Sequence, residues 1–291
     1  MTDEARNEFV AIARGARRLI ERERAAGAGE LLAASVGAAR AARPAPPRGP
    51  DREPAAASEA AESMFEQATA NAPPPGMRGA NRPLHPIDAG SRAAIDAESR
   101  PLLDAIAREV KACQKCALFG TRTQAVPGVG SALSGIAFVG EGPGADEDRL
   151  GEPFVGRAGQ LLDRILEAMN EAALIPGLKL DRSTVFIGNI VHCRPPENRV
   201  PLPAEVEQSF PYLKRQLAAL KPRIICCLGK TAAEAMLGVK SALGPLRGRT
   251  HSWGDSKVVV TYHPAACLRN PGYKRPVWED MQFLAREYLT D

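Results

Sequence analysis

Residues 101–289 alternate between short apolar strands and amphipathic helices, and this alternation constrains the fold more than any other feature of the chain. Strands are predicted at 135–140, 184–191, 223–228 and 257–262, and helices at 101–113, 157–171, 204–220, 230–237 and 276–289. Short β-branched strands that are separated by helices favour a mostly parallel sheet that is buried on both faces. We therefore predict a three-layer α/β domain over residues 101–291, with a central sheet and helices on both faces.

The first hundred residues have a different character. Apolar residues recur at helical spacing near the start, so residues 1–40 are expected to form a helical segment. Residues 41–100 are rich in Ala and Pro, a composition that buries too little apolar area to offset chain entropy, and we predict a disordered linker there. A helix at the end of a long linker is a common recognition device, so residues 8–35 are either a small amphipathic hairpin or a docking element for a partner protein.

Composition narrows the class of protein. The formal net charge of +4 is too small for a polybasic tail, although it leaves an anionic partner open. The chain contains no run of 18 apolar residues and begins with acidic residues instead of a basic signal region, so we expect a cytoplasmic protein without a membrane segment. The sequence carries no signal for oligomers, and we expect a monomer. Six cysteines without a signal peptide indicate buried thiols, metal ligands or reactive groups rather than disulfides.

The residues that follow the predicted strands are where chemistry is expected, because ligands of parallel α/β sheets bind beyond the carboxyl ends of the strands. These residues are Gly-Glu-Gly-Pro-Gly at 140–144, Gly-Asn at 188–189, Leu-Gly-Lys-Thr at 228–231 and Tyr-His-Pro at 262–264. Neither of the two common phosphate-binding glycine patterns fits the glycine-rich turn, so no nucleotide cofactor is expected.

Three ordered segments carry a resemblance to a known family. GEGPGADEDRLGEPFVGRAGQLLD at 140–163, GNIVHCRPPENR at 188–199 and YHPAACLRNP at 262–271 resemble the uracil-DNA glycosylases, most closely the family 4 type, and the likeness covers about residues 105–289. The resemblance implies a DNA-repair enzyme that flips uracil out of DNA and hydrolyses its N-glycosidic bond to leave an abasic site. No lysine occupies a motif position that would make it a Schiff-base nucleophile, so we expect no strand cleavage.

The resemblance also implies roles for single residues. Phe154 stacks on the base, Asn189 reads the uracil edge, and His263 donates to uracil O2 as negative charge builds on the leaving base. Glu141 either orients the attacking water or stabilises the oxocarbenium-like sugar. Glu147 lies where the family places an acidic residue near uracil C5; the other interpretation is a solvated run at the start of a helix. Gly142 replaces a small alanine, a change that we expect to be nearly neutral.

DNA contacts are expected from backbone amides and from residues near the mouth of the site. These are Arg157, Lys230, Thr231, Arg269 and Leu268, with Arg247 and Arg249 as further candidates. The third motif departs from the family, because Ala265 and Cys267 stand where relatives carry a serine and a leucine wedge. Cys267 or Leu268 could still act as the wedge.

The resemblance further implies a 4Fe-4S cluster. Cys113, Cys116 and Cys193 match three of the four cysteine ligands of the family, whereas the fourth place is Ser209. Three outcomes stay open: Ser209 binds iron, the site holds a three-iron or labile cluster, or packing replaces the cluster. The adjacent Cys226 and Cys227 are interpreted as buried strand thiols.

Two other classes of function compete with the enzyme. The first is a weakly active or inactive iron-sulfur module that binds DNA or uracil and recruits partners. The second, a nucleotide-binding metabolic enzyme on the same scaffold, rests on fold analogy alone. Replacing Asn189 with alanine separates the enzyme from the binding module, because only the enzyme would lose uracil excision.

Overall fold

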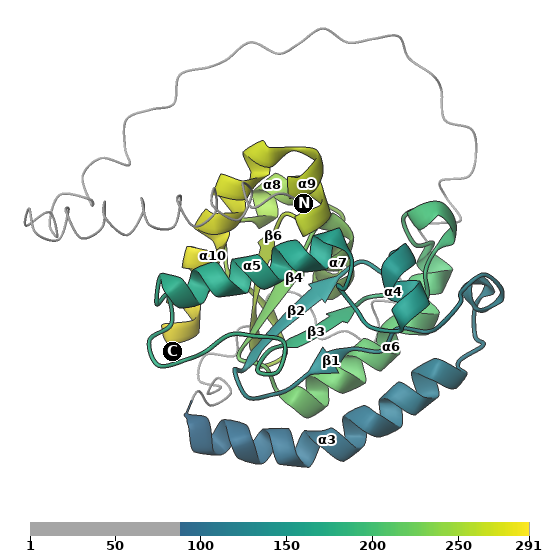
Figure 1. The fold of residues 1–291 in the computed structure, drawn as a ribbon, viewed down its shortest axis with the longest axis horizontal. Coiled ribbons are helices and arrows are strands. Elements are labelled where there is room, and N and C mark those ends of the chain that lie inside the picture. The colour runs from purple at the N-terminus through teal and green to yellow at the C-terminus, as the bar shows by residue number, and fades with distance from the viewer. Residues whose placement is uncertain (1–87, 291) are drawn as a thin grey trace, which may run out of the picture. The chain divides into compact units, whose positions relative to one another are not determined.

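A computed structural model describes residues 88–290 and has a six-stranded sheet at its centre. The strands lie in the order β1-β3-β2-β4-β6-β5 (Figure 1), and β2, β3, β4 and β6 run parallel to one another. Their bounds are β1 (Val129–Gly130), β2 (Ile136–Gly140), β3 (Phe186–Asn189), β4 (Ile224–Leu228), β5 (His251–Trp253) and β6 (Ser256–Thr261). The mostly parallel sheet is confirmed. Sequence reasoning missed the two antiparallel edge strands β1 and β5, which are only two and three residues long.

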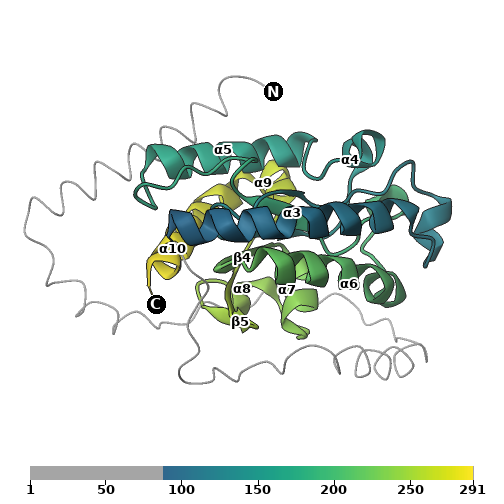
Figure 2. The ribbon, with the colours of Figure 1, turned by 90° about the horizontal axis from the view of Figure 1, so that it is seen from below.

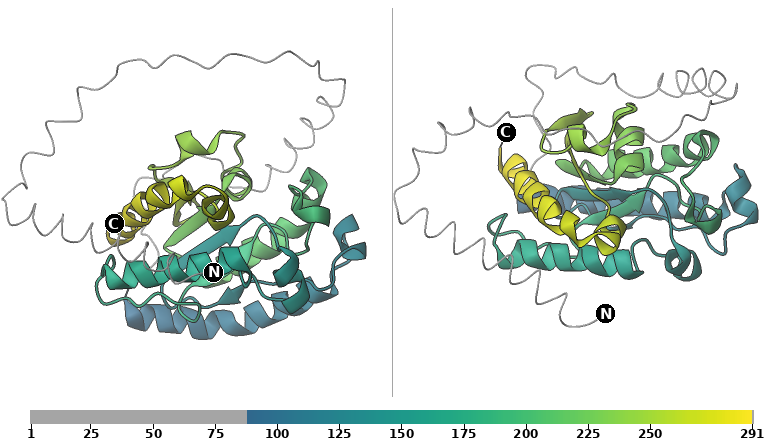
Figure 3. Two further views of the ribbon diagram at one scale, coloured as in Figure 1. Left: turned by 45° about the horizontal axis from the view of Figure 1, so that its top comes forward. Right: turned by 90° about the horizontal axis from the view of Figure 1, so that it is seen from above.

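Helices cover both faces of the sheet, as predicted. They are α3 (Ala89–Ala112), α4 (Ala145–Leu150), α5 (Arg157–Glu171), α6 (Pro203–Leu220), α7 (Lys230–Leu237), α8 (Leu243–Leu246), α9 (Pro264–Arg269) and α10 (Lys274–Leu289). Three short 3-10 turns complete the list: η2 (Ala117–Gly120), η3 (Pro196–Asn198) and η4 (Pro271–Tyr273). Helices α5 and α10 lie on one side of the sheet and α6 and α7 on the other (Figure 3).

The core lies between the sheet and its helices. All residues of β2, β3, β4 and β6 are buried, which explains why these strands are mostly apolar. On the face covered by α6 and α7, side chains such as Val139, Ile225 and Val258 pack against Leu213 and Met236 in one cluster. Cys226 and Cys227 are fully buried in β4, and burial raises the pKa of both thiols, so their interpretation as strand thiols is confirmed.

Helix α3 begins at Ala89, so residues 89–100 are helical and do not belong to a linker. Arg92 in its first turn is buried and donates to the carbonyls of Ala132 (2.6 Å), Leu220 (3.0 Å) and Lys221 (2.7 Å). Asp96 accepts from the backbone of Ala132, and α3 then runs along α6 (Figure 2). The predicted boundary was wrong for two reasons. Polar residues make the contacts of the first turns, and apolar periodicity does not detect them. Proline is also common at the first position of a helix, so Pro101 suggested a start there although it lies inside α3.

The predicted helical segment 1–40 and residues 41–87 of the predicted linker lie outside the described residues, as does the docking element at 8–35. Between residues 88 and 290, no helix combines the length and the apolar character that a membrane span needs.

Candidate active site

The carboxyl ends of four parallel strands bring the predicted site residues to one edge of the sheet. Gly140, the last residue of β2, pairs in register with Asn189, the last residue of β3. The backbone of Gly229, which follows β4, donates to the carbonyl of Thr261 at the end of β6, and Tyr262 and His263 come next. The placement predicted from the strand ends is therefore confirmed for all four loops.

Two of the predicted site residues, Phe154 and Asn189, meet over Gly140, and we call these residues and the neighbouring His263 the candidate pocket. A Cβ atom at this glycine would lie 2.5 Å from Asn189 Oδ1 and 2.6 Å from Phe154 Cζ, so the carboxamide and the ring both approach this residue. The rings of Phe154 and His263 are stacked, with centroids 5.5 Å apart and an angle of 29° between their planes. Phe154 and Asn189 are almost fully buried. Phe154 thus links the other two predicted site residues, with Asn189 on it at Gly140 and His263 stacked on its ring.

Asn189 leaves a polar atom unused in this pocket. Its side chain is only 2% exposed, yet Oδ1 accepts no hydrogen bond from any residue of the described range. A buried carbonyl oxygen without a donor costs free energy, and proteins rarely keep one without a function. The atom is therefore available to a donor on a bound molecule.

Phe154 is held in an uncommon backbone conformation, with φ of 55°. Arg182 fixes it, because its guanidinium donates to the carbonyls of Pro153 and Phe154 while its Nε donates to Asp163 at 2.7 Å. Gly159 lets helix α5 approach closely, since a Cβ there would lie 1.6 Å from the carbonyl oxygen of Phe154. The strained turn thus has support from two sides.

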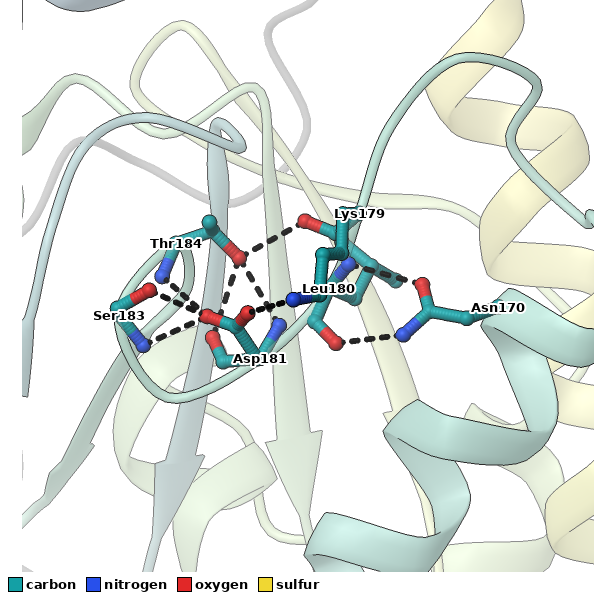
Figure 4. A network of polar contacts seen from close by, with 6 residues as sticks. All are labelled: Asn170, Lys179, Leu180, Asp181, Ser183 and Thr184. Atoms are coloured by element: carbon teal, nitrogen blue, oxygen red, sulfur yellow. Dashed lines mark hydrogen bonds and ion pairs between the residues drawn. The ribbon is translucent and has the colours of Figure 1, made fainter.

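The loop that carries Arg182 is itself tied down (Figure 4). Asn170 at the end of α5 accepts from the backbone of Leu180 at 2.8 Å and donates to its carbonyl at 2.7 Å. Asp181 accepts from the backbone of Ser183 at 2.9 Å and of Thr184 at 3.2 Å. Sequence reasoning missed Arg182, because it lies 28 residues from Phe154 and no motif signals the contact.

Glu147 makes contacts with the backbone rather than with the pocket. Its Oε1 accepts from the N–H groups of Val155 and Gly156, both at 2.9 Å, and its Oε2 accepts from Gly144 at 3.1 Å. The residue is buried, so the interpretation as a solvated run is wrong for it. These contacts favour a role in holding the loop next to Phe154 over the direct contact with uracil C5 that the resemblance implied.

His263 caps the start of α9, and this contact selects its tautomer. Its Nδ1 accepts from the backbone of Ala265 at 3.1 Å, so a neutral imidazole carries its proton on Nε2. Burial and, to a smaller extent, the charge of Arg269 lower the pKa of His263 to about 4. At neutral pH the side chain is therefore an uncharged donor.

Glu141 and Thr231 form a pair at the ends of β2 and β4. The Thr231 hydroxyl donates to Glu141 Oε2 at 2.5 Å, and both side chains are partly exposed. The hydroxyl that we expected to contact DNA phosphate therefore holds the candidate catalytic carboxylate. Gly142 lies beyond this pair, where a Cβ would approach Val191 Cγ2 to 2.6 Å. The expectation that alanine is nearly neutral there is wrong, because the branched Val191 side chain would have to move.

The remaining DNA-contact candidates divide into two groups. Arg157, Lys230, Arg249 and Arg269 are exposed and Leu268 is partly exposed, as DNA contacts require. Cys267 is 1% exposed, so it cannot be the wedge. The expectation that Arg247 contacts DNA is not supported either, because Arg247 donates to Asp280 at 2.8 Å and to the carbonyl of Pro276 at 2.9 Å.

The three candidate cluster ligands line one cavity, and none of the candidate pocket residues belongs to its wall. Cys113, Cys116, Cys193 and Ser209 share its wall with Val110, His192, Gln208 and Tyr212. In the described part of the chain, no three His, Cys, Asp or Glu side chains are grouped closely enough for one metal ion. The wall therefore offers thiols, which are the donors that an iron-sulfur cluster takes, and a cluster needs each thiolate to bind a different iron.

The contacts around the cavity distinguish the thiols from the serine. Burial raises the pKa of Cys193, and Arg122 opposes this effect through a contact of 2.9 Å between Nη1 and Sγ. Ser209 Oγ accepts from the backbone of His192 at 3.0 Å and lies 2.8 Å from His192 Nδ1. The place of the fourth ligand is thus occupied by a hydroxyl that already has protein partners. His192 is a buried part of this wall.

Comparisons with known proteins agree with these motifs. The family model of the uracil DNA glycosylase superfamily matches residues 127–282. A type-4 uracil-DNA glycosylase of Archaeoglobus fulgidus is 42% identical over 188 residues, which are 62% of this chain and 90% of the relative. The type-4 enzyme of Saccharolobus solfataricus is 42% identical over 62% of this chain and 83% of its own length. That of Sulfurisphaera tokodaii is 40% identical over 65% of this chain and 86% of its own. The chain therefore belongs to the uracil-DNA glycosylase superfamily, and within it to the type-4 group.

Proposed function

We propose that this protein is a uracil-DNA glycosylase that hydrolyses the N-glycosidic bond of uracil in DNA and leaves an abasic site. The observation that carries the proposal is the meeting of Phe154 and Asn189 over Gly140, with His263 stacked on Phe154 and Glu141 next in the chain. The relatives at about 40% identity bear the name of this activity. A base must leave the DNA stack to reach such a pocket.

The pocket binds the flipped base by shape and by its edge. Phe154 offers an aromatic face, which favours any flat base and supplies affinity rather than selectivity. Asn189 supplies selectivity, because its free Oδ1 accepts from uracil N3–H while its amide donates to O4. Cytosine has the opposite pattern at these two positions, so it would leave a buried Asn189 group without a partner.

His263 stabilises the leaving base. Its Nε2–H donates to uracil O2 as negative charge develops on the base, and a neutral donor does this without losing its proton to solvent. The contact with the backbone of Ala265 keeps the proton on the nitrogen that faces away from α9. In a pocket that excludes water, such a donor aimed at developing charge contributes about 2.7–4 kcal/mol.

Glu141 acts on the sugar side of the bond. Its carboxylate orients the attacking water or stabilises the oxocarbenium-like sugar, and in both roles it must keep one orientation. Thr231 supplies that orientation through its hydrogen bond to Oε2. We therefore assign Thr231 to the positioning of Glu141 and phosphate contacts to Arg157, Lys230 and Arg269. The partly exposed Leu268 is assigned to the apolar wedge instead.

We also propose that Cys113, Cys116 and Cys193 hold an iron-sulfur cluster. The thiols are the donors that such a cluster requires. The role of the cluster would be structural, because hydrolysis of the glycosidic bond transfers no electron. The cluster would tie the segment after α3 to the segment after β3. Cytoplasmic location, a monomeric state and a protein partner for residues 8–35 remain predictions.

The test is the release of uracil from single-stranded and duplex oligonucleotides by protein purified with and without air. Excision by the wild type and its loss in Asn189→Ala, with DNA binding retained, would establish the enzyme. Folded protein that binds DNA but releases no uracil would favour the binding module. A broad absorbance near 400 nm reports the cluster separately from activity.

A further inference from the structure

Three side chains form a stack directly beside the proposed active site. The guanidinium carbon of Arg247 lies 4.4 Å from the ring centroid of Tyr262. The rings of Tyr262 and Tyr273 are nearly parallel, with centroids 4.2 Å apart and an angle of 15° between the planes. Two groups this close to the same ring cannot share one face, so Arg247 and Tyr273 cover opposite faces of Tyr262. Tyr273 is therefore the last member of the stack.

The stack is fixed to the core at its other end. Asp280 is buried and accepts from Arg247 Nε at 2.8 Å and from Thr261 Oγ1 at 2.6 Å. Arg247 also donates to the carbonyl of Pro276, so both helix α10 and strand β6 hold the guanidinium in place. A ring at the end of a fixed stack has little freedom left to lose when a further ring is added to it.

The position of the stack relates it to the DNA strand. Tyr262 directly precedes His263, and Tyr273 closes the segment that carries Leu268 and the exposed Arg269. Tyr273 is partly exposed, so part of this side chain is accessible to a bound strand. A base that has left the duplex exposes the face of its neighbour, and that neighbour has to pass close to the pocket mouth. Stacking on an aromatic ring suits every base, because each base has a π-face.

We infer that Tyr273 stacks on the nucleobase next to the flipped uracil, with Tyr262 and Arg247 as its support. The inference rests on the proposed function for the identity of the strand. It gives the enzyme a second aromatic contact, outside the pocket, which tolerates any neighbouring base. The contact replaces part of the hold on the strand that the missing leucine wedge would have provided.

The test compares Tyr273→Leu with Tyr273→Phe. Phenylalanine keeps the ring, so it should bind single-stranded DNA like the wild type, whereas leucine should weaken binding about tenfold, in line with the 1–3 kcal/mol of a stacked base. Oligonucleotides carry 2-aminopurine on either side of uracil, or five nucleotides away as a control. Wild type and Tyr273→Phe should quench one adjacent probe, and Tyr273→Leu should quench it less. Equal binding and equal quenching by a folded Tyr273→Leu protein would overturn the inference.

A second measurement needs no variant and covers the case in which Tyr273→Leu does not fold. A strand with 5-iododeoxycytidine beside the uracil is irradiated on the wild-type protein, and the crosslink is mapped by mass spectrometry. A crosslink at Tyr273 supports the inference, and crosslinks confined to other segments overturn it. Uracil release by the wild type is scored in parallel. Stacking without release would contradict the proposed function alone, whereas release without stacking would contradict this inference alone.

Discussion

Replacing Thr231 with valine removes the hydroxyl that donates to Glu141 at 2.5 Å and keeps the branched shape of the side chain. A hydrogen bond to a charged group contributes about 1.5–3 kcal/mol. If this energy orients the carboxylate in the transition state, kcat should fall by about 10- to 100-fold, because each 1.36 kcal/mol of barrier is tenfold in rate. The affinity for uracil-containing DNA should change by less than about twofold, since the hydroxyl makes no contact with the strand in this role.

The assay is single-turnover release of uracil from a saturating single-stranded substrate, with affinity measured separately on a strand without uracil. Thr231→Ser is the matched control, because serine keeps the donor and should retain most of kcat. In the background of Glu141→Ala, adding Thr231→Val should cost little more, since the two residues act as a unit.

The contrasting outcome is well defined. If Thr231 instead contacts phosphate, as we expected from its place near the mouth of the site, its replacement would lower the affinity for every strand. The salt slope would stay nearly unchanged, because the hydroxyl carries no charge. An unchanged kcat in Thr231→Val, or the same loss in Thr231→Ser, would refute the positioning role.

Three further predictions follow from the same contacts. Gly140→Ala places a methyl group 2.5 Å from Asn189 Oδ1, so uracil release should fall at least about a hundredfold. Because the methyl group also overpacks this buried site, the melting temperature should fall by about 2–4 °C for each kcal/mol of stability lost. The pKa of His263 is about 4 in the folded protein against 6.5 in the unfolded chain. Its contribution of up to about 3 kcal/mol is complete above pH 6.5 and lost as the pH falls through 4, and urea unfolding of His263→Gln should lose less stability over this range than the wild type. Ser209→Cys supplies a fourth thiolate, and should raise iron content and absorbance near 400 nm per chain; no gain would contradict the proposed cluster.

The regular part of the fold could be predicted because its signal is local. Helices α5 and α7 have the bounds that the apolar periodicity indicated, and the ends of the four parallel strands differ from the predicted ends by at most two residues. The start of α3 could not be predicted in this way. Its buried positions include Arg92, Asp96 and Ser99. Arg92 and Asp96 both form hydrogen bonds with the backbone of Ala132, which lies 40 and 36 residues away along the chain. Periodicity of apolar residues does not detect a helix whose first turns are held by polar contacts.

The location of the site residues could be predicted from the sequence, but the contacts that each residue makes could be predicted only in part. Strand ends located Glu141, Asn189 and His263, because the geometry of a parallel sheet brings such ends together. Partners that come from other segments left no trace in the motifs. Thr231 was placed with the phosphate contacts and Glu147 with the base, since a sequence shows that a polar residue is near a site and does not show which atom it binds.

Gly140 shows why the pocket depends on a missing side chain as much as on the side chains present. Asn189 and Phe154 approach this residue so closely that a single added carbon would contact both. The space next to Gly140 is therefore narrow. Asn189 Oδ1 faces this residue and has no hydrogen-bond donor within residues 88–290. A flat ring with an N–H group fits both conditions, whereas a bulkier ligand fails the first and a purely apolar ligand fails the second. Selectivity for the base thus originates in the backbone at the end of β2, and the motif side chains act on a space that the glycine keeps open.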